Sequence, residues 1–248
     1  MRKLISLNEN WSLSFPKGER LAEKVTLPHT WNAVDGMDGN GSYLRTTGVY
    51  RCTFLKPEQP LEGGRVYVEV LAAALAAVVK VNGTVAVTHE GGFSAFRADI
   101  TDLCKEGNNE MTIEVSNEDT PSMYPASADF TFYGGLYRGV NLISVPHTHF
   151  DLDYYGGSGI KVTPKPTEDG GATFEIESFV TNQEDCFTVM YSIEDACGCE
   201  VAAAVRPADD TAVTIYVPDA KLWSMDEPNL YTVVARLQKN NETYDEIH

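Results

Sequence analysis

Residues 129–140 read Asp-Phe-Thr-Phe-Tyr-Gly-Gly-Leu-Tyr-Arg-Gly-Val and place one carboxylate among several aromatic side chains. The carboxylate of Asp129 can accept hydrogen bonds from hydroxyl groups. Flat aromatic rings can cover the apolar C–H faces of a pyranose. The segment therefore combines the two side-chain types that a sugar-binding site needs, and its aromatic members are Phe130, Phe132, Tyr133 and Tyr137.

The same segment also has a purely structural interpretation. The aromatic side chains can belong to a hydrophobic core, and Asp129 can be a turn residue. Gly134-Gly135 marks a turn, because glycine accepts positive φ angles and allows another segment to approach closely. Arg138 then leads into an apolar stretch, residues 140–143, which predicts a strand. The residue types alone leave both interpretations open.

Two further groups carry residue types that can bind a metal ion. Cys197-Gly198-Cys199 could be a redox or metal pair, but it has no second Cys/His pair at zinc spacing, so we expect no functional role for it. His147 and His149 have no third ligand nearby in a recognisable motif, which favours a linker or the start of a strand. We therefore predict no metal ligand and no cofactor from these groups.

The composition fits a globular protein with one large domain or two modest ones. The chain has 248 residues, and 43% of them are hydrophobic. The formal net charge of −17 argues against nucleic acids and anionic membranes as partners, because like charges repel, but it does not bear on neutral sugars. No apolar run approaches the ~20 residues that cross a bilayer. The charge therefore argues against these two classes of partner and leaves a carbohydrate partner open.

Cysteine usage indicates the compartment. The five cysteines form an odd, scattered set, which is a poor framework for disulfides and fits a reducing environment. The first residues turn polar after a short stretch, so no signal peptide is visible. We therefore expect a cytoplasmic location.

Short strands separated by polar turns are predicted to position these side chains. Asn82-Gly83 is typical of the type I′ turn of a hairpin. The alanine-rich run at residues 71–77 is ambiguous, because alanine favours helix. Beyond residue 149, strands recur at intervals of about 8–12 residues, the pattern of a small β-sandwich. The predicted strands are 11–15, 49–54, 65–70, 78–83, 84–88, 111–116, 151–155, 159–164, 172–182, 187–195, 201–205, 212–217 and 232–237.

Several motifs, taken in order, resemble the N-terminal part of family 2 glycoside hydrolases, the β-galactosidase and β-glucuronidase group. Residues 129–138 resemble the segment that ends the sugar-binding domain of that family. The common order and spacing of the motifs extend across nearly the whole chain. The other motifs are LPHTWN at 27–32, GVYR at 48–51, VNG at 81–83, GGFSAF at 91–96, LWS at 222–224 and PNLY at 228–231.

The resemblance implies an all-β fold in two domains. An N-terminal jelly-roll (galactose-binding-like) β-sandwich is expected over residues 1–146, and an immunoglobulin-like β-sandwich over residues 147–248. Residues 71–77 are then a tight passage between strands, and His29 and Trp31 stabilise the packing of the first domain.

The resemblance also implies where the catalytic groups lie. In this family both catalytic glutamates lie on a (β/α)₈ barrel that follows the second sandwich. No stretch of this chain alternates strands and helices as a barrel requires. Glu118 follows an asparagine, as the family's acid/base glutamate does, but its surroundings match a sandwich strand and the loop leading to Asp129. We therefore predict that this chain contains no catalytic residue and is inert alone.

The resemblance then implies that this chain is a supporting, non-catalytic part of a retaining β-glycosidase. Its expected partners are the C-terminal barrel of the same enzyme and a carbohydrate. Asp129 matches a family aspartate that reaches into the sugar subsite and binds hydroxyls or an associated cation, such as Na or Mg, in the full enzyme. Arg45 lies in a loop that approaches the catalytic pocket in related enzymes. It is the second candidate contact with substrate or barrel, and its alternative interpretation is a solvated arginine.

The sugar itself is less well defined by the sequence. Gly139 stands where β-galactosidases commonly have an aspartate, and no motif for reading a glucuronate is recognised. A neutral β-galactoside is the favoured substrate, and the resemblance implies a dimer or tetramer of the full enzyme. Two rivals stay open, a stand-alone carbohydrate-binding or adhesion module and a structural interaction protein with an acidic surface.

Overall fold

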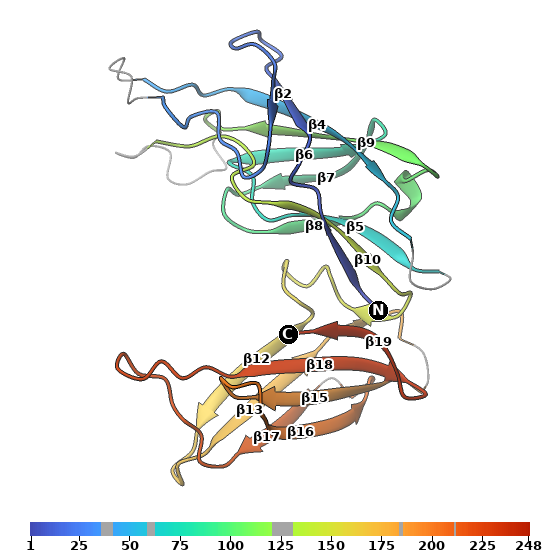
Figure 1. Cartoon of the computed structure of the whole chain (residues 1–248), viewed down its shortest axis with the longest axis vertical. Coiled ribbons are helices and arrows are strands. Elements are labelled where there is room, and N and C mark those ends of the chain that lie inside the picture. Colours follow the sequence, from blue (N-terminus) through green and yellow to red (C-terminus); the bar gives the residue numbers. More distant parts are fainter. Residues whose placement is uncertain (36–41, 59–62, 121–130, 184–185, 211) are drawn as a thin grey trace. The chain divides into compact units, whose positions relative to one another are not determined.

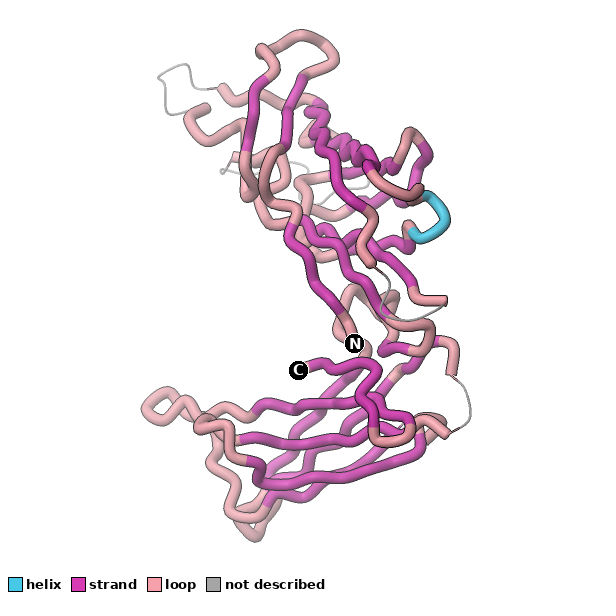
Figure 2. The backbone as a smooth tube through the Cα atoms, turned by 45° about the vertical axis from the view of Figure 1, so that its right-hand side comes forward, coloured by secondary structure: helices cyan, strands magenta, loops and turns pink. Residues whose placement is uncertain are grey.

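The computed structural model describes residues 1–35, 42–58, 63–120, 131–183, 186–210 and 212–248, and these consist almost entirely of strands and loops (Figures 1 and 2). One short 3₁₀ helix, Thr101–Leu103, occurs in these ranges. No helix among them is long and apolar enough to cross a membrane. The chain divides into two compact units, one built from Leu4–Glu58 and Arg65–Ser144 and one mainly from Val145–His248. The predicted all-β fold class is confirmed.

The first unit is a sandwich of two sheets. The larger sheet has the strand order β3-β2-β4-β9-β6-β7, and the smaller has the order β1-β10-β5-β8. β4 and β9, which are far apart in sequence, pair antiparallel at the centre of the larger sheet. The strands are β1 Lys3–Ser6, β2 Trp11–Ser14, β3 Glu23–Val25, β4 Thr47–Leu55, β5 Arg65–Val70, β6 Ala76–Val81, β7 Thr84–Glu90, β8 Phe96–Asp99, β9 Asn108–Ser116 and β10 Val140–Val145.

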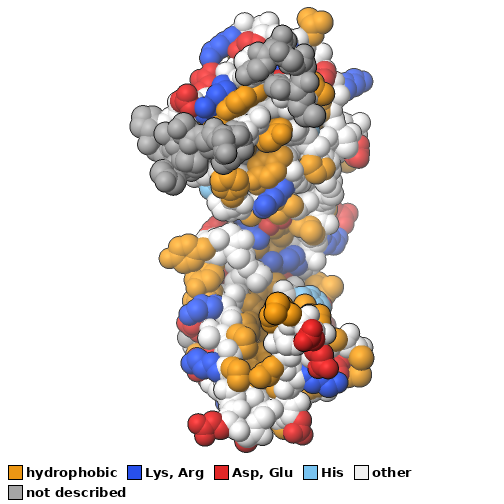
Figure 3. Space-filling view, turned by 90° about the vertical axis from the view of Figure 1, so that its left-hand side faces the viewer, with side chains coloured by type: hydrophobic (Ala, Val, Ile, Leu, Met, Phe, Trp, Pro, Cys, Tyr) orange, Lys and Arg blue, Asp and Glu red, His pale blue; other side chains and the backbone are white. Residues whose placement is uncertain are grey.

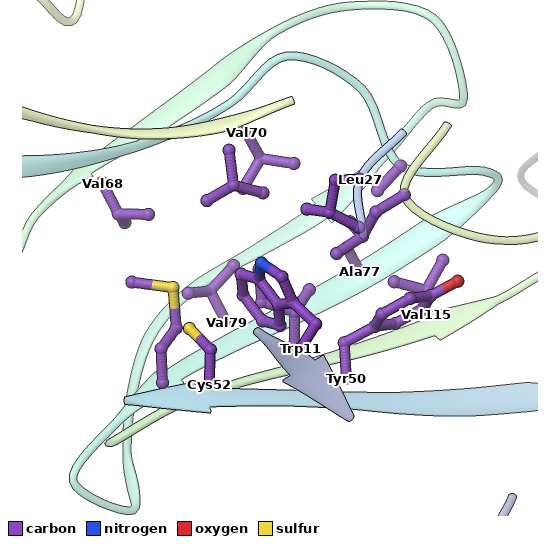
Figure 4. Close-up of a cluster of buried hydrophobic side chains, with 14 of the residues drawn as sticks. Trp11, Leu27, Tyr50, Cys52, Val68, Val70, Ala77, Val79 and Val115 are labelled. Carbon is purple, nitrogen blue, oxygen red and sulfur yellow. The ribbon is translucent and has the colours of Figure 1, made fainter. Parts of the chain in front are cut away.

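The core of the first unit lies between its two sheets. β9 buries alternate residues, as expected for a strand with one face toward a core, and Met111, Ile113 and Val115 are fully buried. Trp11 and Tyr50 contribute the large aromatic rings of this cluster and meet edge to face, with centroids 6.4 Å apart (Figure 4). The sheet that carries β4 and β9 is thereby fixed on its inner face.

The alanine-rich run forms the predicted passage between the two sheets. β5 lies in one sheet and β6 in the other, and Leu71–Leu75 connects them without helix. Ala72 and Ala73 are fully buried, so small side chains are required there and burial overrides the helix propensity of alanine. Asn82 and Gly83 both have positive φ angles, 50° and 84°, at the hairpin between β6 and β7. Both predictions are confirmed.

The second unit contains a three-stranded sheet, β12-β13-β17, a four-stranded sheet, β16-β15-β18-β19, and the short pair β11-β14. Its core is a separate cluster of buried side chains that includes Phe174, Tyr191 and Ala235. The unit therefore has the two packed layers of a β-sandwich. The strands are β11 His149–Phe150, β12 Ile160–Pro166, β13 Ala172–Ser178, β14 Val180–Thr181, β15 Thr188–Glu194, β16 Glu200–Pro207, β17 Ala212–Val217, β18 Thr232–Lys239 and β19 Glu242–Ile247.

One predicted strand of this unit is wrong. Residues 151–155 form bends and turns, whereas the strand is the two-residue β11 just before them. Tyr155 has a φ angle of 48°, which a strand does not accommodate. The Tyr154 ring is instead stacked on Phe179, with centroids 4.1 Å apart. The Tyr154 side chain is thus used for packing within a turn.

Candidate functional site

Two buried asparagines join the loops at one end of the first sandwich. Asn117 follows β9, and Asn32 follows the Thr30-Trp31 segment. The Nδ2 group of Asn117 donates to the carbonyl of Phe132 at 2.8 Å and to Oδ1 of Asn32 at 3.2 Å. Oδ1 of Asn32 also accepts the backbone N–H of Gly134 at 2.7 Å. Three segments that are far apart in sequence are therefore held at one place by side-chain amides.

The same amides also hold the entry to β4. Oδ1 of Asn117 accepts the backbone N–H of Thr46 at 2.8 Å, and Nδ2 of Asn32 donates to the carbonyl of Leu44 at 2.9 Å. Both asparagine side chains are almost completely buried, with residue exposures of 0% and 1%. Their donors and acceptors are matched inside the protein, as buried polar groups require. We call this group, with Asp35 and Gly134, the asparagine cluster.

Asp35 closes the cluster on the side of the 25–35 loop. Its carboxylate accepts the backbone N–H of Leu44 at 2.9 Å and Nδ2 of Asn32 at 2.8 Å, and it pairs with the guanidinium of Arg20. Burial alone would raise the pKa of this carboxyl group. The hydrogen bonds and the arginine outweigh burial, so the pKa of Asp35 lies below its ordinary value. The group is an anion used for structure.

Gly134 packs directly on the indole ring of Trp31. A Cβ atom at this position would lie 2.1 Å from a ring carbon of Trp31 and 2.8 Å from Cγ of Asn117, far inside contact distance. Trp31 is itself buried and donates its Nε1–H to the carbonyl of Leu44 at 3.2 Å. Only glycine fits at position 134, because the ring against it is fixed by burial and by its own hydrogen bond.

The next glycine lies against a second pair of fixed groups. Gly135 has a φ angle of 126°, and a Cβ there would lie 2.6 Å from the carbonyl oxygen of His29 and 2.7 Å from the Tyr50 hydroxyl. Nδ1 of His29 and the Tyr50 hydroxyl are hydrogen-bonded at 2.9 Å. Burial lowers the pKa of His29, against the opposing charge of Glu23, and burial raises the pKa of Tyr50. Both pKa shifts favour the neutral forms of these groups. The predicted structural role of His29 and Trp31 agrees with these contacts.

Arg45 lies beside the asparagine cluster, and two nitrogens of its guanidinium contact protein oxygens. Its Nε–H donates to the carbonyl of Asn117 at 2.8 Å, and it forms an ion pair of 2.5 Å with Asp119. The guanidinium carbon lies 4.9 Å from the centroid of the Phe132 ring, in cation–π geometry. The Arg45 side chain is 24% exposed. Arg45 ties the loop after β9 to the segment that contains Phe132.

The aromatic residues of the 129–140 segment divide between core and surface. Phe132 is buried under Arg45, whereas Tyr133 is 49% exposed. Tyr137 donates its hydroxyl hydrogen to the carbonyl of Gly92. Asp129 and Phe130 lie outside the described residues. The segment that follows them, from Thr131 into β10, is the one that the asparagine cluster holds.

Glu118 has a contact suited to a surface residue. Its side chain is 40% exposed and forms an ion pair with Lys17. His149 begins β11 and is fully buried, as the interpretation as a strand start predicts. The backbone N–H groups of Cys197 and Cys199 both donate to Oδ1 of Asp195, at 2.9 and 3.0 Å, which makes Cys197-Gly198-Cys199 part of a turn.

Sequence reasoning missed the two residues that organise this end of the sandwich. In the sequence, Asn32 is one residue of the LPHTWN motif, and Asn117 is the residue before Glu118. Each asparagine directly follows an apolar or strand segment whose end is buried, and that position is a usable signal for a capping side chain. Their mutual contact spans 85 residues of sequence, so the pairing itself requires the fold.

Both units match models of one protein family. Residues 3–146 match the model described as "Glycosyl hydrolases family 2, sugar binding domain", and residues 158–248 match the model described as "Glycosyl hydrolases family 2". The sugar-binding domain comes first and the second family model follows it, which is the domain order that the resemblance predicts. Together they cover most of the chain.

Individual relatives carry two different names. A β-glucuronidase of Bacteroides fragilis is 27% identical over 260 residues, covering 99% of this chain and 37% of that protein. A β-galactosidase of Thermoanaerobacter pseudethanolicus is 26% identical over 262 residues, covering 98% of this chain and 34% of that protein. The chain thus spans about a third of the length of these relatives.

A solved structure with much higher identity is similar over the whole chain. The FMN-binding β-glucuronidase from Facaelibacterium prausnitzii L2-6 is 84% identical and superimposes with a TM-score of 0.98, covering 100% of this chain and 38% of that one. Here too the chain spans well under half of the relative. The fold of both units is therefore that of the corresponding part of this relative.

The contact between Gly134 and Trp31 makes a direct prediction. Gly134→Ala should lower the free energy of unfolding of the first unit by about 3 kcal/mol, because the added methyl group overlaps a ring that cannot move. Urea unfolding followed by the fluorescence of the buried Trp11 and Trp31 measures this loss. Gly83→Ala is the control, since its Cβ would meet open space and only its positive φ opposes alanine, at about 1 kcal/mol. If both variants lowered the free energy of unfolding equally, the Trp31 ring would have moved to make room for the methyl group, which would contradict the prediction.

Proposed function

The chain belongs to family 2 of the glycosyl hydrolases, and we propose that it is the non-catalytic N-terminal part of a retaining β-glycosidase that hydrolyses O-glycosidic bonds. The observation that carries this proposal is the match of both units, in order, to the family over about a third of the length of its relatives. In this proposal the catalytic carboxyl groups belong to a further barrel. They stand about 5–5.5 Å apart there, one as nucleophile and one as acid/base.

The first sandwich, for which we propose the bounds 1–146, supplies a wall of the sugar pocket. Asp129 is the group that contacts the sugar hydroxyls or an associated cation. The asparagine cluster supports this role, because it fixes the segment that follows Asp129 through Phe132 and Gly134. Arg45 is a positioning residue in this scheme, since its guanidinium is held by Asn117, Asp119 and Phe132. A rigid wall contributes binding energy that orients the reacting bond.

We propose a β-glucuronide as the substrate of the whole enzyme, in place of the β-galactoside that the sequence favoured. The support is the name of the relative with 84% identity, which is a β-glucuronidase. Gly139 is consistent with a substrate other than a β-galactoside. A side chain there would meet the Asn8 amide at 3.0 Å, so the aspartate common in β-galactosidases has little room. We also propose that the protein acts in the cytoplasm, from its five scattered cysteines.

The activity prediction compares two proteins. The protein encoded by the full reading frame should hydrolyse p-nitrophenyl β-glucuronide with a kcat/KM at least about tenfold above that for the β-galactoside, because a site that hydrogen-bonds a carboxylate rejects an analogue without it. Residues 1–248 alone should release no p-nitrophenol. Turnover by the 248-residue chain would contradict the non-catalytic role. Equal rates for both glycosides would remove the glucuronide proposal and leave the family activity in place.

The stand-alone carbohydrate-binding module is tested with the same chain. Calorimetric titration of residues 1–248 with glucuronides and galactosides should give no binding heat, because one wall of a pocket buries too little of a sugar. Measurable affinity for oligosaccharides, together with a stop codon at residue 248, would favour that module. No heat together with such a stop codon would favour a structural interaction protein.

The role of Asp129 has its own prediction. Asp129→Ala in the full-length enzyme should lower kcat/KM by about 10²-fold, since a hydrogen-bonding contact to the sugar is lost while its partners stay buried. The unfolding temperature should change little. Asp209→Ala is the matched control on an exposed residue of the second unit and should leave kcat/KM unchanged. An unchanged kcat/KM for Asp129→Ala would place the sugar contact elsewhere.

We further propose that the full-length protein binds FMN, by extension from the relative with 84% identity, which is described as FMN-binding. Flavin rings stack on aromatic side chains, and the phosphate pairs with cations. The described residues offer such a pair at Tyr137 with Arg138, so the residue types fit. FMN supplies redox chemistry in the proteins that use it, but hydrolysis of a glycoside transfers no electrons.

The flavin prediction therefore separates binding from activity. FMN titrated into the full-length protein should bind and lose fluorescence, and the rate of glycoside hydrolysis should stay within about twofold, because the reaction needs no oxidant. Absence of binding at micromolar FMN would end this extension from the relative. Riboflavin, which lacks the phosphate, is the control ligand and should bind at least about tenfold more weakly.

A further inference from the structure

The second sandwich exposes four large apolar side chains in one loop. Residues 218–231 connect β17 to β18 (Figure 1). Within this loop the exposed fractions are 54% for Leu222, 61% for Trp223, 89% for Met225 and 69% for Leu230. Large apolar residues gathered on one surface of a soluble protein mark an interaction site. On the second sandwich in Figure 3, hydrophobic side chains gather around a hollow.

The loop is built to hold these side chains in place. Trp223 and Pro228 form a β-bridge, and the N–H of Ser224 donates to the carbonyl of Glu227 at 2.9 Å. Nδ2 of Asn229 donates across the loop to the carbonyl of Leu222 at 3.1 Å. A loop that is braced internally in this way, with its apolar side chains exposed to solvent, is organised in advance for a partner.

A groove lies beside the loop on the same unit. Its volume is about 810 Å³. Apolar side chains from β12 and β13 form its floor, including Ile160, Val162 and Phe174, and Trp223 and Leu230 contribute from the loop. The polar side chains along it include Lys221 and His248. The groove and the loop together form one apolar surface, which we call the β17–β18 surface.

We propose that the β17–β18 surface is the docking site for the catalytic segment of the same polypeptide. This inference rests on the proposed function, which places that segment after residue 248. His248 lines the groove, so a polypeptide joined to it starts at this surface. Such a segment is present at millimolar effective concentration, which favours it over a separate partner. The relatives, of which this chain spans about a third, have ample further length.

The chemistry of the surface defines the matching patch on the catalytic segment. It must be apolar at its centre, to cover Trp223, Met225 and Leu230. Asp226 and Glu227 lie at the turn of the loop, so a basic rim on the partner would complement them. An aromatic anchor in a groove, surrounded by apolar contacts, is the usual core of such an interface.

Oxidation of Met225 by hydrogen peroxide tests the docking. In the 248-residue chain, Met225 should be oxidised at close to the rate of N-acetylmethionine amide in the same tube, because it is 89% exposed, and the buried Met111 should be protected. In the full-length protein, the oxidation of Met225 should slow at least about tenfold. Peptide mass spectrometry reads each site separately. An unchanged rate in the full-length protein would overturn the docking.

Paired variants give an independent readout. Trp223→Ser with Leu230→Ser should leave the urea midpoint of the 248-residue chain unchanged, since both side chains are exposed there. In the full-length protein the same pair should lower the midpoint and restore rapid oxidation of Met225. Val205→Ser, on a 56% exposed residue of the same unit, is the control and should do neither. If the pair has no effect in either protein, the surface is not an interface.

The remaining outcomes separate this proposal from the proposed function. Protection of Met225 in a full-length protein that hydrolyses no glycoside supports the docking and removes the glycosidase. Hydrolysis of a glycoside by a full-length protein whose Met225 is not protected supports the glycosidase and removes the docking. Protection of Met225 in the 248-residue chain that rises with concentration, with a dimer in sedimentation, assigns the surface to a second copy. If FMN protects Met225 in the 248-residue chain, the β17–β18 surface is assigned to the flavin. A reading frame that stops at residue 248 removes both proposals.

Discussion

The contact of Gly134 with the Trp31 ring is the constraint on which the candidate site depends. It leaves no space for a Cβ atom, so the backbone after Asp129 must lie against the indole. The indole in turn is fixed by burial and by its bond to Leu44. A position determined by excluded volume is more sharply defined than one determined by an exposed ion pair.

The asparagine cluster complements this contact with directional bonds. Asn32 and Asn117 satisfy backbone groups of Thr46, Phe132 and Gly134, none of which lies in a strand ladder at that point. Removing one buried amide would leave several polar groups without partners, at about 1–3 kcal/mol each. The polar groups of the cluster are thus committed to one another. Such mutual hydrogen bonding suits a structural role of the cluster better than acid/base catalysis, which requires groups that exchange protons.

The sequence was sufficient for the fold class and for most strands, because period-two apolar patterns and turn residues such as Asn82-Gly83 act locally. The alanine-rich run required the family pattern, since helix propensity is overridden there by the burial of Ala72 and Ala73. Residues 151–155 were assigned wrongly, because the spacing of strands along the sequence does not reveal the positive φ angle of Tyr155 or the packing of Tyr154 on Phe179. The role of Asn117 was not predictable, since its partners lie up to 85 residues away.

The two sandwiches use their side chains in opposite ways, and the difference has a physical meaning. The first buries polar side chains at one end and satisfies them internally. The second braces Trp223 and its neighbours in a loop with the apolar side chains in water. Exposed apolar surface does not stabilise an isolated domain, because burial is what lowers the free energy. An ordered loop that holds such surface in place is consistent with selection for a bound state, so the stability of the second sandwich and its association are best treated as one problem.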